Sequence, residues 1–335
     1  MKRFLAIAGP GLLVAATGIG AGDLATASFA GSILGTTILW AAVVGAFMKF
    51  VITEGLARWQ LATGTTLLEG LVQRFGRPAG WLFLAYLLFW SFFVASALMS
   101  ACGVTLHALL PFTDDAQRAK VVYGVLASLI GAALVLRGGY ALFSRVMQVC
   151  IGAMFLTVII TAALLWPGMT PVAAGLLLPI IPAQDGGLAW TVALMGGIGG
   201  TVTVLGYGYW IREEGRQGPG ALRICRIDLA VAYAVTAAFG VAMVIIGSTI
   251  EVHGRGAGLI VGLAEQLGAA LGPAGRVLFL LGAAGAVFSS LLGVWQAIPY
   301  LFADLWRLLL APTQPGARND PEPDLEHTLP ARVFL

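Results

Sequence analysis

Long apolar runs recur along this 335-residue chain and constrain its fold more than any other feature. Each run reaches or approaches the roughly 20 residues that a helix needs to cross the hydrocarbon core of a bilayer. The chain is 59% apolar and 10% charged, whereas about one quarter of an average soluble domain is charged. We therefore expect an all-α polytopic membrane protein, with spans near residues 4–35, 38–62, 80–110, 119–136, 141–166, 187–211, 226–250 and 274–308.

The segments between the spans set the domain organisation and the orientation. Residues 67–77 are amphipathic and predict a short helix on the membrane surface, whereas residues 167–186 are rich in Pro and Gly and predict a loop. We expect one transmembrane domain over residues 1–311 and a flexible, Pro-rich tail over residues 312–335. Arg and Lys are concentrated in the loops on the side of the N-terminus, which predicts that both termini face the cytoplasm of a bacterial inner membrane.

The first span is interrupted at residues 18–23, which read Gly-Ile-Gly-Ala-Gly-Asp. Glycine weakens a helix, and an ionisable side chain such as Asp23 is unfavourable in hydrocarbon unless it has a partner. Many secondary transporters build an ion or substrate site from a broken helix that is buried in protein. The alternative is that the glycines only permit close helix packing and that Asp23 lies at an interface. We favour the site.

The sixth span contains a second interruption, Gly-Gly-Ile-Gly-Gly at residues 196–200. Matched interruptions in two halves of a chain indicate inverted repeats with a site near the bilayer midplane, here over residues 1–166 and, incompletely, 187–311. Unwound backbone exposes carbonyl oxygens that can coordinate a cation, and threonine hydroxyls can add further oxygens. The expected binding set is Asp23, Gly20, Thr17, Gly200, Thr201 and Thr203.

The other ionisable groups have structural interpretations. Glu54 and Arg58 are spaced i, i+4 in the second span, so we expect them to pair, with Lys49 supporting the pair. Asp228 and Asp304 lie at span ends and are expected to be surface or helix-end acids. His107, at the outer end of the third span, is expected to be an interfacial residue rather than a ligand.

Motifs of other functional classes are absent from the sequence. It has no nucleophile elbow, no P-loop and no HExxH pair, and its three cysteines have no paired spacing. Its basic residues are scattered rather than clustered. We therefore expect neither an enzyme, nor a resident cofactor, nor a nucleic-acid partner; the expected partners are the lipid bilayer and a transported cation or small solute.

Two segments resemble one known family. Residues 9–13 (Gly-Pro-Gly-Leu-Leu), followed by the break and by Ala-Gly at residues 30–31, resemble the first helix of the Nramp divalent-metal transporters. Residues 199–202 (Gly-Gly-Thr-Val) are similar to the sixth helix of that family. The resemblance implies a LeuT-type fold of five-plus-five inverted repeats, with helices one and six broken, and transport of a divalent metal cation by alternating access.

The chain also departs from the family pattern. The first break in the family reads Asp-Pro-Gly-Asn, in which the Asp and Asn bind metal; here residues 20–23 read Gly-Ala-Gly-Asp, so the acid is displaced to Asp23. The Met-Pro-His of the sixth helix corresponds to Thr203, Val204 and Leu205, and the third span lacks the acids that the family uses in proton transfer. With Asp23 and Thr203 as metal ligands, all donors are oxygens, which suits a hard ion such as Mg²⁺ or Mn²⁺ that need not be coupled to protons.

Two alternatives stay open. The same fold can carry a small organic solute, such as an amino acid or an amine, whose cationic group would meet Asp23. A fold of ten helices also exceeds the eight spans expected here, so the chain is either an inactive truncated fragment or a protein whose missing wall comes from a partner chain or a dimer.

Overall fold

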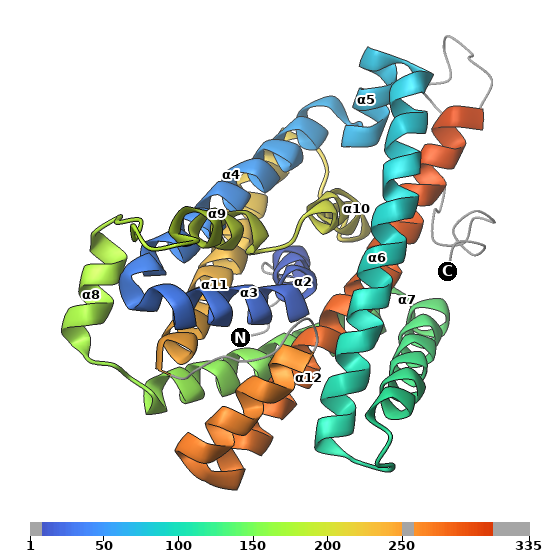
Figure 1. Ribbon diagram of the computed structural model, residues 1–335. Coiled ribbons are helices and arrows are strands. Elements are labelled where there is room, and N and C mark those ends of the chain that lie inside the picture. The colour runs from blue at the N-terminus through green and yellow to red at the C-terminus, as the bar shows by residue number, and fades with distance from the viewer. Residues whose placement is uncertain (1–8, 250–257, 311–335) are drawn as a thin grey trace.

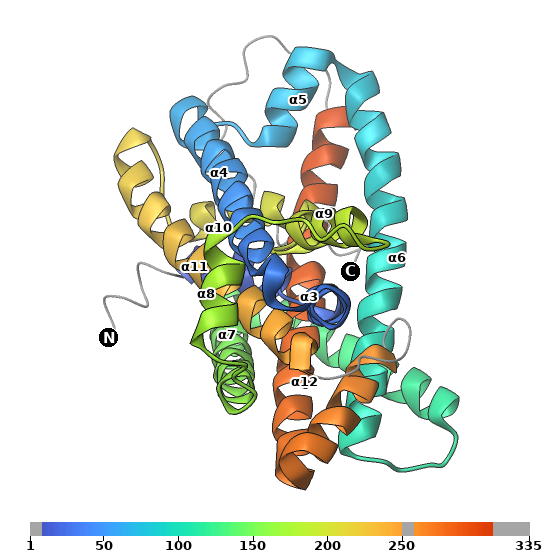
Figure 2. The ribbon, with the colours of Figure 1, turned by 60° about the vertical axis from the view of Figure 1, so that its left-hand side comes forward.

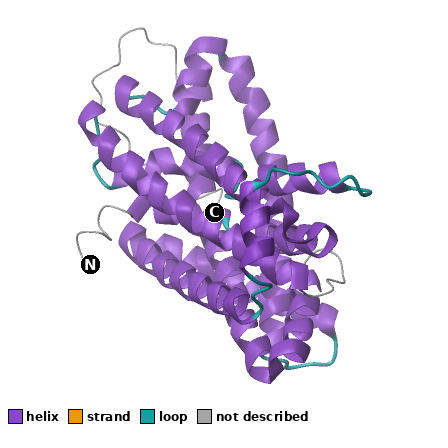
Figure 3. Cartoon of the chain, turned by 90° about the vertical axis from the view of Figure 1, so that its left-hand side faces the viewer, coloured by secondary structure: helices purple, strands orange, loops and turns teal. Residues whose placement is uncertain are grey.

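A computed structural model describes residues 9–249 and 258–310, and this part of the chain consists of helices and their connecting loops (Figures 1 and 3). The tail expected over residues 312–335 lies outside the described residues. Within the described ranges, six helical stretches are long and apolar enough to cross a membrane. They are Ala21–Thr63, Arg77–Leu109, Ala116–Leu164, Gly187–Glu213, Pro219–Thr249 and Gly258–Leu310.

Two of these stretches each contain parts of two expected spans, separated by a glycine with positive φ. Helix α3 (Ala21–Leu34) ends at Gly35, where φ is 65°, and a 3-10 turn leads into α4 (Leu39–Thr63). Helix α7 (Ala116–Leu164) bends at Gly139, where φ is 57°, and its two halves run in different directions (Figure 1). The expected second, fourth and fifth spans therefore exist as separate helices.

Both expected interruptions are present. The first span divides into α2 (Gly9–Gly18) and α3. The sixth span divides into α9 (Gly187–Gly197) and α10 (Gly206–Glu213), joined by an unwound segment and the 3-10 turn η2 (Val202–Leu205). Figure 1 shows α2, α3, α9 and α10 between the longer helices rather than at the edge of the molecule.

The long helices enclose these broken ones from two sides (Figure 2). Helix α11 (Leu222–Thr249) packs against α2, α3 and α4. Helix α12 (Gly258–Leu310) packs against α6 (Arg77–Leu109), α7 and α2, and it bends at Gly272. The apolar core is continuous through these contacts, so the breaks are surrounded by protein, which is the condition for unwound backbone at membrane depth.

Two short helices lie between the spans. Helix α5 (Leu67–Phe75) confirms the helix expected at residues 67–77, and Thr66 and Glu69 form a capping box at its start. The prediction of a loop over residues 167–186 is wrong in part, because α8 (Met169–Leu177) forms there. Helix α8 packs on the 3-10 turn η1 (Gly35–Ile38), where its Gly175 lies against the Thr36 carbonyl; a further 3-10 turn, η3, covers Pro219–Ala221.

Close packing of α3 against α11 requires a glycine at position 31. A Cβ atom on Gly31 would lie 2.3 Å from the backbone carbonyl oxygen of Val244, a separation that real Cβ atoms do not show. Backbone cannot move aside as a flexible side chain can, so a larger residue would push the two helices apart.

We expect the substitution Gly31→Ala to lower the free energy of unfolding by about 1–3 kcal/mol, the usual effect of overpacking a tight core. The matched control is Gly55→Ala in α4, where a Cβ atom meets nothing within 4 Å and the better helix propensity of alanine is expected to leave stability equal or higher. Thermal unfolding in detergent compares the two; equal melting temperatures would contradict the packing argument.

Candidate functional site

The two interrupted helices meet at their breaks. A Cβ atom on Gly18 would lie 2.6 Å from the carbonyl carbon of Gly199 and 3.0 Å from the amide nitrogen of Gly200. Gly199 and Gly200 both have φ of 81°, a conformation that favours glycine. The glycines of the two motifs therefore serve two purposes, which are close backbone approach and unwinding. The first break is shorter than expected, since only Ile19 and Gly20 lie between α2 and α3.

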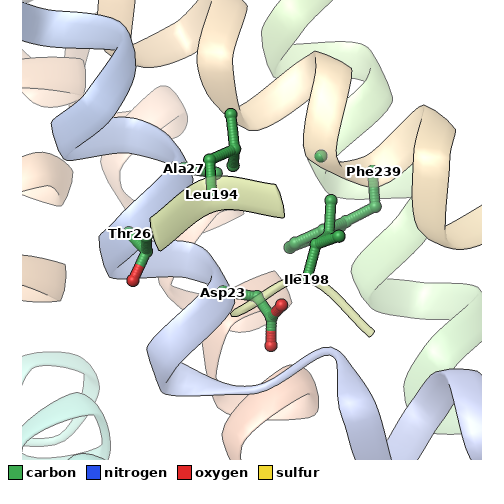
Figure 4. Close-up of a pocket in the computed structure, with 7 residues that line it drawn as sticks. Asp23, Thr26, Ala27, Leu194, Ile198 and Phe239 are labelled. Carbon is green, nitrogen blue, oxygen red and sulfur yellow. The ribbon is translucent and has the colours of Figure 1, made fainter. Parts of the chain in front are cut away.

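Asp23 joins the two breaks. It is buried in the first turn of α3, where the helix dipole favours a negative charge. Its Oδ2 atom accepts a hydrogen bond from the N–H of Gly20 at 3.2 Å, and its Oδ1 atom accepts one from the N–H of Gly199 at 3.2 Å. One carboxylate thus binds an amide from each broken helix. Figure 4 shows Asp23 beside the segment that carries Ile198.

Serines of α12 bind the carbonyls that the first break releases. The N–H of Gly20, which would bond the Ala16 carbonyl in a continuous helix, donates to Asp23 instead. The hydroxyl of Ser289 donates to the Ala16 carbonyl at 3.0 Å, and the hydroxyl of Ser290 donates to the Ile19 carbonyl at 3.2 Å. Neither serine was predicted to contribute to the site, although two adjacent hydroxyls within an apolar run are a visible signal.

A lysine of α4 binds the second break. The Lys49 ammonium donates to the Gly200 carbonyl, so the prediction that Lys49 supports the Glu54–Arg58 pair is wrong. That pair exists, at 3.0 Å, but the other Glu54 oxygen binds Arg226 of α11 at 2.8 Å. Sequence spacing cannot show this, because Lys49 reaches a carbonyl 151 positions away.

The expected threonine ligands differ in their placement. The hydroxyl oxygen of Thr203 lies 2.6 Å from the position that a Cβ atom on Gly200 would occupy, so it is beside the second break. Thr17 is buried against Gly293 of α12, and its hydroxyl has no hydrogen-bond partner among the described residues. Thr201 is exposed. The structure therefore brings Asp23, Gly20, Gly200 and Thr203 to the joined breaks, with Thr17 one residue before them.

A cavity of about 10 Å³ adjoins Asp23. Its walls are mostly apolar, and the volume is that of a single water-sized group. No group of three or more His, Cys, Asp or Glu side chains occurs in the part of the chain that the structure describes, so a bound cation would rely on one carboxylate with backbone and hydroxyl oxygens. The cavity is lined by Asp23, Thr26, Ala27, Leu194, Ile198, Phe239 and Gly240 (Figure 4).

Comparison with known proteins identifies the chain. The family model for Nramp, natural resistance-associated macrophage protein-like, matches residues 11–314. The chain belongs to the Nramp family. Two curated relatives named divalent metal cation transporter MntH are similar. The one from Chromohalobacter salexigens is 32% identical over 178 residues, which are 52% of this chain and 39% of that protein. The one from Pectobacterium carotovorum is 25% identical over 258 residues, 72% of this chain and 58% of that protein.

Solved structures of one transporter share this fold. Crystal structures of the Eremococcus coleocola manganese transporter superpose with a TM-score of 0.74 at 18% identity and cover 94% of this chain and 67% of theirs. The likeness confirms the LeuT-type fold of an integral membrane protein. The chain spans well under two thirds of the length of the two curated relatives described above.

A buried acid also anchors the first half-helix of this Nramp protein. Asp228 was expected to be a surface or helix-end acid, but it is fully buried in α11. Its carboxylate accepts hydrogen bonds from the Gly11 N–H at 2.9 Å, the Tyr207 hydroxyl at 3.0 Å and the Arg216 guanidinium at 2.8 Å. Gly11 must be small because a Cβ atom there would lie 2.3 Å from the carboxylate. The family-like Gly-Pro-Gly sequence thus fits α2 against α11.

A second buried acid connects the surface helix to the core. Asp304 was also expected to be a surface or helix-end acid; it pairs with Arg307 at 2.8 Å but is fully buried. Its other oxygen accepts hydrogen bonds from Thr66 at 2.9 Å and Tyr209 at 2.7 Å. These contacts tie α5 and α10 to α12. Both acids were misplaced because their partners are far away in sequence.

We expect Asp228→Ala to destabilise the protein by about 3–5 kcal/mol, the usual loss when one partner of a buried ion pair is removed. The exposed Asp114, substituted in the same way, is the control and is expected to have little effect. Thermal unfolding of both variants in detergent measures the difference. If the melting temperature of Asp228→Ala equals that of the wild-type protein, the hydrogen bonds to Asp228 do not anchor α2.

Proposed function

We propose that the chain forms the core of a secondary transporter that moves a hard divalent cation, such as Mn²⁺ or Mg²⁺, by alternating access. The observation that supports this most is the bridging of both helix breaks by Asp23. The site lies at the junction of the elements that rearrange in transporters of this architecture. Binding at Asp23 is therefore well placed to influence how the two broken helices sit against each other.

The donor types support a hard cation. Asp23 supplies the charge, and the Gly20 and Gly200 carbonyls and the Thr203 hydroxyl supply neutral oxygens; Thr17, with its unpartnered hydroxyl, and Thr201 complete the proposed set. Oxygen donors suit Mg²⁺, Ca²⁺ and Mn²⁺, whereas thioether and thiolate donors suit softer metals. The names of the relatives, divalent metal cation transporter and manganese transporter, agree with a divalent cargo.

The cavity sizes favour an ion over an organic solute. A site for a small organic molecule typically has a volume of about 300–1,000 Å³, whereas the cavity at Asp23 has about 10 Å³. Larger cavities of about 510 Å³ and 240 Å³ exist, but neither is lined by Asp23. The first is bordered by Arg212 and Arg216, which would repel a cationic group.

The repeat organisation and the orientation belong to the same proposal. The breaks after α2 and α9 are consistent with halves over residues 1–166 and 187–311. The distribution of Arg and Lys supports a bacterial inner-membrane protein with both termini on the cytoplasmic side. A partner chain or a second copy that completes the wall of the transporter stays a prediction.

We expect Asp23→Asn to reduce Mn²⁺ and Mg²⁺ uptake into reconstituted vesicles by at least about tenfold. The substitution removes the charge that attracts the cation, and a loss of about 1.4 kcal/mol in binding free energy is a tenfold change in affinity. The amide keeps the shape of the carboxylate and removes its charge. Asp114→Asn, in an exposed loop, is the control and is expected to transport normally. Uptake that strongly prefers Fe²⁺ to Mg²⁺ and requires a pH gradient would show that the oxygen-donor argument is wrong.

The orientation is tested by labelling with a maleimide that does not cross membranes. In intact cells, a cysteine introduced as Asp114→Cys, between α6 and α7, is expected to react, because that loop is assigned to the outside. A cysteine introduced as Gln73→Cys, on the exposed face of α5, is expected to react only after the cells are opened. The reverse pattern would invert the proposed topology.

A further inference from the structure

Lys49 contributes a positive charge to the same place that a cargo cation would occupy. It lies near the middle of α4, a helix long enough to cross the membrane, where an ammonium is unfavourable without a partner. Its partner is the Gly200 carbonyl, one of the oxygens that the second break offers to a cation. Gly200 has this carbonyl free because the Val204 N–H, which would bond it in a helix, donates to Thr201 instead.

The surroundings of Lys49 direct its charge toward Asp23. The neighbouring acid on its own helix, Glu54, is already held by two arginines. Asp23 accepts the Gly199 N–H and Lys49 donates to the Gly200 carbonyl, so the two side chains bind adjacent residues of the second break. The stem of Lys49 passes Gly199, where a Cβ atom would lie 3.6 Å from the lysine Cγ, so the glycine-rich segment also accommodates the lysine.

The joined breaks therefore hold an acidic and a basic side chain before any cargo binds. Asp23 bridges the two breaks, and Lys49 binds the carbonyl of the residue next to Gly199. A divalent cation that entered beside the ammonium would meet repulsion from it and would find the Gly200 carbonyl already engaged. The lysine has a flexible stem and is half-buried, so its ammonium has the freedom to leave the carbonyl.

We propose that the Lys49 ammonium is a tethered cation that occupies the empty transport site, and that a divalent cation binds by displacing it from the Gly200 carbonyl. Lys49 is then a specificity-determining residue. A cation whose interaction with the site is too weak to displace the ammonium binds poorly, whereas a strongly interacting cation still binds. This inference rests on the proposed function and assigns a competitor to the same site.

The competing interpretation is that Lys49 is a permanent structural partner of the Gly200 carbonyl. In that case its removal leaves that carbonyl without its donor, and the protein loses stability without gaining affinity. Displacement makes the opposite prediction for affinity. When only a fraction of the protein is competent to bind, the apparent dissociation constant rises in inverse proportion to that fraction.

The test is calorimetric titration of Mn²⁺ and Mg²⁺ into the purified full chain in detergent. We expect the Mn²⁺ dissociation constant of Lys49→Met to be at least about tenfold lower than that of the wild type. A tenfold difference arises if the lysine vacates the site in about one wild-type molecule in ten, and a larger one if it does so more rarely. Lys49→Arg keeps the charge and is expected to stay within a few-fold of the wild type. Lys120→Met, the same substitution at the start of α7, is the matched control and is expected to leave affinity unchanged.

The outcomes separate this inference from the proposed function. If the wild type binds Mn²⁺ and Lys49→Met binds equally or more weakly, the inference is wrong and the proposed function stands. If neither protein binds Mn²⁺ or Mg²⁺, both are wrong. The gain in Lys49→Met must also disappear in the double variant with Asp23→Asn; a gain that persists places the bound metal elsewhere and overturns the inference.

A folding control completes the test. Lys49→Gln retains a hydrogen-bond donor for the Gly200 carbonyl and removes only the charge, so it is expected to bind Mn²⁺ more tightly than the wild type, as Lys49→Met does. Melting temperatures in detergent report whether each variant is folded. If Lys49→Met and Lys49→Gln both fail to fold, the lysine is a structural residue and the displacement inference is overturned.

Discussion

The carboxylate of Asp23 is the interaction on which the central architecture depends. It accepts one N–H from each broken helix, so a single side chain holds the two breaks in register. Without such a bridge, two unwound segments in a low-dielectric interior would both need separate partners for their backbone groups. Position 23 suits this role because the first turn of a helix presents free N–H groups and a positive dipole end to an acid.

The rest of the site follows from the same requirement that buried backbone groups find partners. Ser289 and Ser290 donate hydrogen bonds to carbonyls of the first break, and Lys49 donates one to a carbonyl of the second. These donors come from α12 and α4, so the surrounding helices are fixed relative to the broken ones by polar contacts as well as by packing. The contacts also determine which oxygens remain open to an incoming ion, because each bound hydroxyl or ammonium occupies one of them.

The sequence predicts the spans, both breaks and Asp23 because these features are local. Apolar length, glycine runs and an isolated acid are readable within a window of 20–30 residues, and the family resemblance adds their order. Lys49, Asp228 and Asp304 were misjudged for one physical reason: each acts on a group 151 to 238 positions away. Proximity to a span end indicated the surface for both acids, whereas the tertiary packing of α10, α11 and α12 buries them.

The displaced acid and the added lysine are best understood together. The resemblance aligns the acid at the first position of the family's break with Gly20, the N-cap of α3, and Asp23 follows three residues later in the first turn of that helix. From there its carboxylate reaches back to the Gly20 N–H and across to the Gly199 N–H of the second break. That shift leaves Gly20 free to approach α12 closely, where a Cβ atom would lie 2.6 Å from the Ser290 hydroxyl. A buried carboxylate is unfavourable without a nearby cation, and in the displacement that we propose Lys49, bound to the adjacent Gly200 carbonyl, is that cation when the cargo is absent.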